Sequence, residues 1–179
     1  MKSLVKSIAA VVLAGSMMLS VAACANFNLL TYKEFKSALE ESQNMEDDDY
    51  TVRKKGTYEG YDIKHSVAAI KGKCNFMFVE FDDQDDAVDY FEDVYDAFED
   101  ALKDEEFDGN YKKSYSESSV TGYILVDGKS EATKFINGKC YGGIFLKENT
   151  VVVVMANSQK NSDIEKIDAM LDAIGYPKP

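Results

Sequence analysis

The chain has 179 residues, enough for one domain with a hydrophobic core, and a formal net charge of −12. Such a charge argues against a nucleic acid partner and against docking on anionic lipid, because both polyanions repel it. The sequence has no Trp and only two Pro, both near its C-terminal end, so it contains no Pro-rich linker. We therefore expect a single domain over residues 31–177.

Residues 1–23 have the three parts of an export signal, beginning with a short basic region. The apolar run over 8–19 falls short of the roughly 20 residues that a bilayer span needs. It leads into Val21-Ala22-Ala23-Cys24, which resembles the lipobox of bacterial lipoproteins. The resemblance implies cleavage before Cys24 and a diacylglyceryl group on its thiol. The alternative is a transmembrane anchor that stays attached.

Cleavage would leave 156 residues and, because the signal carries two lysines and no acid, a net charge of −14. Residues 24–30 would then be a lipidated N-terminus and a short tether. Two acyl chains hold a protein stably on a membrane. We therefore expect the domain at the outer face of the cell membrane, close to the lipid, with no cofactor besides that covalent lipid.

The first helix is predicted from Thr31, where Glu34 completes a capping box, to about Ser42. An acidic loop over 46–49 is predicted to lead into a short strand near 50–53. The segment 58–61 is predicted to be a loop.

Two strands are predicted over 63–70 and 75–81, joined by the Lys71-Gly72-Lys73 turn. The second strand is apolar on both faces, which is typical of a central strand. The helix predicted over 85–103 has the clearest period in the chain, with an apolar stripe opposite a face of Asp and Glu.

From Tyr111 onward the pattern alternates with a period of two. Asp-Gly, Asn-Gly and Glu-Asn pairs separate the expected strands, as in hairpins of an antiparallel meander. The four strands are predicted over 120–126, 130–136, 140–146 and 150–156.

A last helix is predicted from Ser162, with Glu165 completing a second capping box, to Gly175. The fold class is therefore α+β: a mainly antiparallel sheet with a C-terminal meander and three amphipathic helices packed on one face. Strand 75–81 with its helix is similar in layout to strand 150–156 with the last helix, which leaves open an internal duplication.

Two cysteines remain after lipidation, Cys74 and Cys140, each following a Gly-Lys pair. In an oxidising compartment the two could form a disulfide that adds roughly 4 kcal/mol to the free energy of unfolding. The alternative is two separate small core residues, because free Cys is readily buried.

No catalytic residue is assigned. The single histidine, His65, lies on a predicted strand, where a lone His is usually a surface or satisfied core residue. No nucleophile elbow, phosphate loop, dinucleotide fingerprint or zinc-protease motif occurs. A hydrolase with two catalytic carboxylates stays open as an alternative, because acidic residues are abundant.

Asp104, Glu106 and Asp108 partly imitate the start of a calcium loop, with Gly109 at its sixth position. The closing glutamate of such a loop would fall at 115, which is a tyrosine. Two interpretations follow: a weak calcium site, or a solvated helix end.

The acidic face of the helix over 85–103 either keeps the protein soluble or meets a basic partner. This candidate partner face consists of Asp89, Glu92, Asp93, Asp96, Glu99 and Asp100.

Three short segments resemble those of small uncharacterised surface lipoproteins of Gram-positive bacteria. They are Leu30-Thr31-Tyr32-Lys33-Glu34-Phe35, Asn149-Thr150-Val151 and Ile174-Gly175-Tyr176. That resemblance implies no established activity. We expect a non-enzymatic binding or accessory module for a protein partner or an envelope component, with a calcium-responsive domain and a carboxylate hydrolase as alternatives.

Overall fold

The computed structural model describes residues 27–179, so the export signal and Cys24 lie outside the described residues. In this part of the chain three helices, seven strands and one 3-10 turn follow one another. They are α1 (Tyr32–Gln43), β1 (Tyr50–Tyr58), β2 (Tyr61–Lys71), β3 (Cys74–Phe81), α2 (Gln84–Lys103), β4 (Asp108–Ser116), η1 (Glu117–Ser119), β5 (Thr121–Ser130), β6 (Gly138–Lys147), β7 (Thr150–Ala156) and α3 (Asn161–Ile174).

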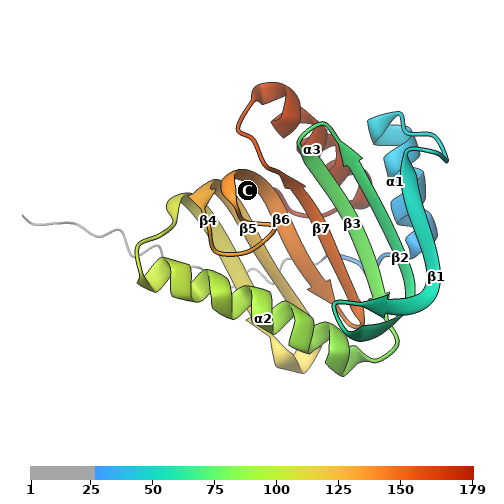
Figure 1. Cartoon of the computed structure of the whole chain (residues 1–179), viewed down its shortest axis with the longest axis horizontal. Helices are drawn as coiled ribbons and strands as arrows, with labels where there is room; N and C mark the ends of the chain where they lie inside the picture. The colour runs from blue at the N-terminus through green and yellow to red at the C-terminus, as the bar shows by residue number, and fades with distance from the viewer. Residues whose placement is uncertain (1–26) are drawn as a thin grey trace, which may run out of the picture.

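The seven strands form one sheet in the order β1-β2-β3-β7-β6-β5-β4, and every neighbouring pair is antiparallel (Figure 1). The sheet does not close into a barrel, because β1 and β4 are its edges. The predicted α+β class is confirmed.

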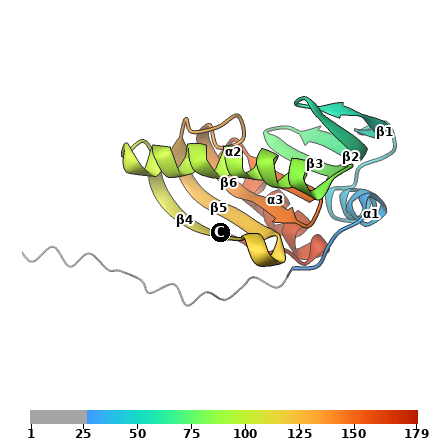
Figure 2. The same cartoon turned by 90° about the horizontal axis from the view of Figure 1, so that it is seen from below.

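Helices cover both faces of the sheet: α1 and α3 lie on one side and α2 on the other (Figure 2). The expectation that all three helices share one face is wrong. The reason is that β7 is buried on both faces of the sheet. Each of its seven residues is at most 2% exposed, and successive side chains point to opposite faces. Val152 and Val154 enter the core beneath α1 and α3, whereas Val151 and Val153 enter the core beneath α2. A strand that is apolar on both faces needs a cover on each.

The two helix starts differ in how they are capped. Thr31 and Glu34 form the predicted capping box at α1, with the Thr31 backbone N–H donating to Glu34 at 2.8 Å. The second capping box is wrong: α3 begins at Asn161, its N-cap is Lys160, and no side chain caps it. Gly175 ends α3 in the left-handed conformation, as predicted.

The strand predicted over 130–136 is wrong, because residues 131–137 form a loop. Thr133 closes this loop by accepting a hydrogen bond from the Ile136 N–H at 2.9 Å. Ile136 is fully buried, which explains the apolar signal in the sequence. The fourth strand of the meander is instead β4, and Asp127-Gly128 lies within β5 rather than at a turn.

The similar layouts of β3–α2 and β7–α3 do not form a symmetric repeat. The two strands are antiparallel neighbours, so the two-fold axis that would exchange them runs perpendicular to the sheet. Such an axis would leave both helices on one face, but α2 and α3 lie on opposite faces.

Cys74 and Cys140 are free and fully buried, so the possible disulfide is not formed. Cys74 packs in the core beneath α1 and α3, and Cys140 packs in the core beneath α2. The sheet therefore separates the two thiols. Each is near a backbone carbonyl instead, that of Asp163 at 3.7 Å and that of Gly128 at 3.6 Å, and burial raises the pKa of each thiol to about 11.

Two glycines with the same backbone dihedral angle allow a matched test of packing in the sheet. Gly142 in β6 has φ +140° and Gly56 in β1 has φ +141°. A Cβ on Gly142 would collide with the Val154 carbonyl and lie 2.9 Å from the Met155 Cα, whereas one on Gly56 meets nothing within 4 Å. We predict that Gly142→Ala lowers the free energy of unfolding by roughly 2–3 kcal/mol more than Gly56→Ala, measured by urea denaturation. Equal losses would contradict this account of the central strands.

The free thiols make a second prediction. A reductant should leave the urea midpoint of the folded domain unchanged, because no bridge exists to break. A Cys74–Cys140 disulfide would instead make the oxidised protein more stable by roughly 4 kcal/mol. Both thiols should react with a thiol reagent only after denaturation, since burial keeps them protonated and inaccessible.

Candidate functional site

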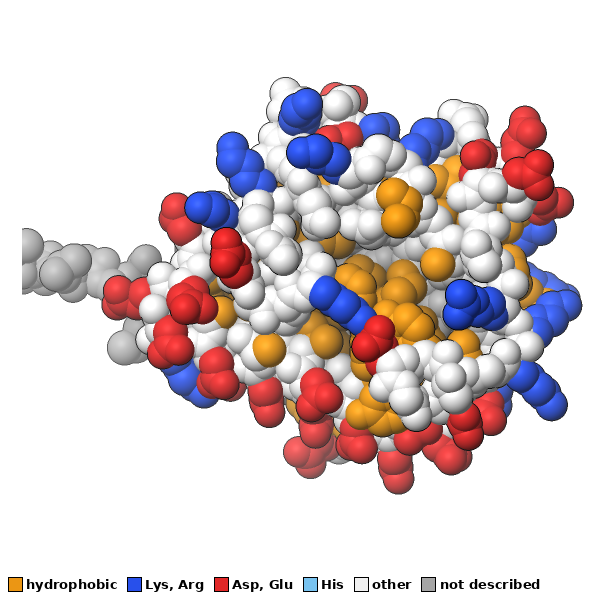
Figure 3. All heavy atoms as spheres, viewed as in Figure 1, with side chains coloured by type: hydrophobic (Ala, Val, Ile, Leu, Met, Phe, Trp, Pro, Cys, Tyr) orange, Lys and Arg blue, Asp and Glu red, His pale blue; other side chains and the backbone are white. Residues whose placement is uncertain are grey.

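The acidic face of α2 is a charged surface that extends along a 20-residue helix. Figure 3 shows acidic side chains gathered along the lower edge, over α2, whereas acidic and basic side chains are mixed along the upper edge. The six residues of the predicted partner face come from a 20-residue helix whose apolar stripe is buried against the sheet. A packed helix holds such charges in fixed relative positions.

Half of the partner face is already engaged within the domain. Glu92 accepts a hydrogen bond from the Tyr115 hydroxyl at 2.8 Å, Glu99 pairs with Lys113, and Asp100 pairs with Lys103 at 2.7 Å. The contacts with Tyr115 and Lys113 tie α2 to β4, whereas the pair with Lys103 lies within α2, and the two lysines neutralise part of the charge of the face.

The remaining three carboxylates form a row, which we call the α2 stripe: Asp89, Asp93 and Asp96. Their spacing of four and three residues places them on one side of the helix. All three are exposed, and none has an ion-pair partner within 4.0 Å among residues 27–179. The α2 stripe is therefore the part of the partner face that is free to meet a cation.

Repulsion among the carboxylates is unrelieved at the start of α2. Desolvation raises the pKa of Asp86, and the neighbouring charges of Asp83 and Asp62 raise it further. Tyr61, on the adjacent hairpin, also has a raised pKa, first from desolvation and then from Asp93 and Asp89. A positive charge placed here would lower the energy of several groups at once.

The candidate calcium residues are not brought together by the fold. Asp104 caps the C-terminal end of α2, and Asp108 already belongs to β4, which pairs with β5 from its first residue. A twelve-residue calcium loop therefore does not form. Within residues 27–179, no three His, Cys, Asp or Glu side chains are grouped so that they could share a metal ion.

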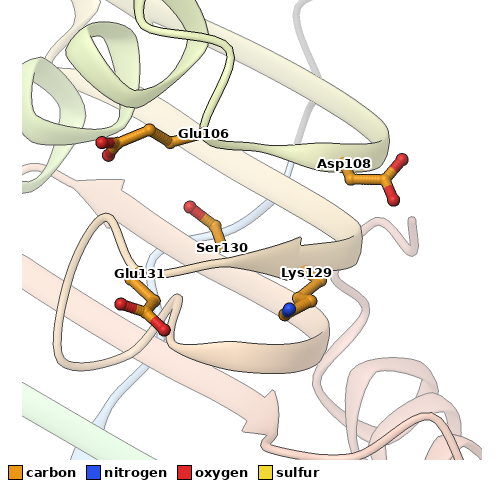
Figure 4. Close-up of a pocket in the computed structure, with 5 residues that line it drawn as sticks. All are labelled: Glu106, Asp108, Lys129, Ser130 and Glu131. Atoms are coloured by element: carbon orange, nitrogen blue, oxygen red, sulfur yellow. The ribbon is translucent and has the colours of Figure 1, made fainter.

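Two of these residues do line an open hollow of about 360 Å³ between the start of β4 and the end of β5. Figure 4 shows the carboxylates of Glu106 and Asp108 pointing in opposite directions. A hydrolase with paired acids needs two carboxyl groups aimed at one bond. Glu106 and Asp108 therefore do not form such a pair. The residues that line the hollow are Glu106, Asp108, Lys129, Ser130 and Glu131.

A polar row crosses the opposite face of the sheet, and sequence reasoning missed it. Directly paired residues of successive strands bring Lys54, His65, Glu80, Thr150 and Lys147 into one line. His65 Nδ1 lies 2.8 Å from Glu80 Oε2, and the imidazole stacks on the Tyr32 ring with 4.3 Å between centroids. The row borders the apolar core beneath α1, and the first turn of α1 packs on it through Tyr32. Glu80, Thr150 and Lys147 lie at or next to the ends of their strands, but Lys54 and His65 lie within theirs, so no shared position in the sequence marked the row.

An open hollow of about 540 Å³ lies between α1 and β1, next to this row. Among the described residues the His65 side chain hydrogen-bonds only Glu80, so no Ser–His or Cys–His pair is present there. The lining residues are Tyr32, Lys33, Lys36, Ser37, Glu40, Val52 and Lys54.

Searches with protein-family models, curated proteins and solved structures gave no match to this chain. The similarity to Gram-positive surface lipoproteins stays a prediction. Over residues 27–179, no helix has both the length and the apolar character required to cross a membrane.

The raised pKa of Asp86 gives a pH-dependent prediction. Because the folded value lies above the ordinary 3.8, ionised Asp86 destabilises the fold at neutral pH, and this effect disappears as the pH falls below 3.8. Asp86→Asn should therefore raise the thermal midpoint at pH 7 and leave it unchanged at pH 3. Asp100→Asn is the control: it removes the pair with Lys103 and should lower the midpoint slightly at pH 7.

Proposed function

We propose that the protein is a lipid-anchored, non-enzymatic binding module on the outer face of the cell membrane. In this proposal the α2 stripe binds a basic segment of a protein partner. The observation that carries it is the row of three exposed carboxylates without ion pairs on a rigid helix. The row lies near Asp86, whose pKa is raised first by desolvation and then by neighbouring carboxylates.

The start of the described chain supports an orientation with α2 facing outward. Phe27 packs on Phe145 and Tyr176, with ring centroids 5.6 and 4.6 Å away, so it belongs to the core beneath α1 and α3. Only two residues separate it from Cys24, and an extended chain spans at most about 11 Å over that distance. A lipid on Cys24 would therefore hold the α1 and α3 face toward the membrane and leave α2 on the far side.

The spacing of the three carboxylates in the α2 stripe suits the binding of a positively charged segment. Asp89 and Asp96 are seven residues apart, which corresponds to about 10 Å along a helix. A segment with cations at similar spacing could pair with all three carboxylates of the α2 stripe. Exposed charges of one sign also speed the encounter with an oppositely charged partner, and this effect weakens with salt.

The test is crosslinking of the full chain on intact cells, followed by binding measurements with the captured protein. We predict a reproducible basic partner whose affinity falls with increasing salt. Replacing Asp89, Asp93 and Asp96 together by Asn should weaken binding at least tenfold, because it removes the three unpaired charges.

A matched control changes the net charge equally on the other parts of the domain. Glu41→Gln, Asp48→Asn and Glu165→Gln together remove three exposed carboxylates outside α2. This triple variant should retain nearly full affinity. Equal losses in both triple variants would contradict a role for the α2 stripe, and capture of no protein would contradict the protein partner.

A further inference from the structure

Lys134 lies in a box of aromatic rings on the face of the sheet that carries α2. Its ammonium group is 5.2 Å from the ring centroid of Tyr58, 5.9 Å from that of Tyr90 and 5.0 Å from that of Phe135. The Glu59 carboxylate completes the box and pairs with the ammonium at 2.8 Å. Tyr90 belongs to the core beneath α2, and Tyr58 and Phe135 pack against that core. Figure 3 shows apolar side chains gathered on this face of the molecule.

The rings come from different elements, and two of them are held by the core. The Tyr58 and Tyr90 rings meet edge to face at 5.6 Å, and Tyr90 is 5% exposed. The Tyr58 hydroxyl lies 3.2 Å from the Met77 sulfur, and Tyr90 also packs on Phe81 at 5.6 Å. These contacts fix the two tyrosines without help from Lys134.

The box suits a cation for ordinary electrostatic reasons. The faces of aromatic rings are negative, and Glu59 adds a full charge. Desolvation alone would lower the pKa of Lys134, but Glu59 and Tyr58 outweigh it, and the pKa lies above its ordinary value. Lys134 itself shows that an alkylammonium group fits beside these three rings.

The loop that carries Lys134 is secured mainly by its own hydrogen bonds. Ala132 N–H donates to the Ser130 hydroxyl at 3.1 Å, Phe135 N–H donates to the Thr133 hydroxyl at 3.2 Å, and Thr133 also closes the loop with Ile136. Lys134 and Glu59 are about half exposed, with side-chain values of 49% and 53%. Ile136 keeps the base of the loop in the core, so Lys134 can leave the box while the sheet stays folded.

We propose that Tyr58, Tyr90, Phe135 and Glu59 form a binding site for the alkylammonium group of a ligand, and that Lys134 fills this site in the free protein. The site is separate from the α2 stripe, since it uses ring faces rather than a row of carboxylates. The ligand class is a primary or quaternary ammonium group.

The test uses tetramethylammonium as the probe and proton NMR of its methyl groups, which ring currents shift upfield inside an aromatic box. Lys134→Gln removes the competing ammonium and keeps a polar side chain of similar length. We expect this variant to bind tetramethylammonium about tenfold more tightly than the wild-type protein does. Adding Tyr58→Leu to Lys134→Gln should abolish the gain.

Neopentyl alcohol, an uncharged molecule of similar branched shape, is the matched control and should bind neither protein measurably. Adding Glu59→Gln to Lys134→Gln leaves every ring in place, and it should weaken tetramethylammonium binding relative to Lys134→Gln alone, because it removes the carboxylate charge of the box. Comparison of choline with N-acetyl-lysine amide then shows which ammonium type the site prefers. The proposal is overturned if Lys134→Gln binds the cation no better than neopentyl alcohol. No partner protein is needed, so this result is independent of the α2 stripe.

Discussion

Burial of the central strands on both faces is the constraint on which the rest of the structure depends. β7 has no residue more than 2% exposed, and its neighbours β3 and β6 are also mostly buried. Such strands need an apolar cover on each side of the sheet. The chain supplies α1 and α3 for one side and the 20-residue α2 for the other. This three-layer arrangement sets the face of the sheet on which the α2 stripe, the polar row and the aromatic box each lie.

The same constraint separates the chemical features of the domain. Phe27 packs beneath α1 and α3, so the start of the domain lies on that side, and the acidic α2 lies on the other. The aromatic box also lies beside α2, because Tyr90 belongs to that helix. The polar row with His65 and Glu80 ends the core beneath α1 and serves its docking. In our account the membrane side and the binding side are therefore opposite faces of one sheet.

Local signals in the sequence predicted the elements well where they were strong. The helix period over 85–103, the Thr31 capping box and the final Gly175 all correspond to the structure. Properties that depend on strand pairing were not predictable. A buried Ile136 imitated a strand, while β4, with most of its residues exposed, gave a weak apolar signal. The side of the sheet that a helix covers, the polar row and the aromatic box all depend on register between distant segments, which no local pattern encodes.

The orientation of the domain is the central claim, and distance to the lipid tests it most directly. The lipidated protein would be bound to vesicles that contain a lipid-borne quencher, with a fluorophore attached at Asp96→Cys in α2 or at Asp172→Cys in α3. Our account predicts strong quenching from the α3 position and weak quenching from the α2 position. Equal quenching, or stronger quenching at α2, would contradict an α2 stripe that faces away from the membrane.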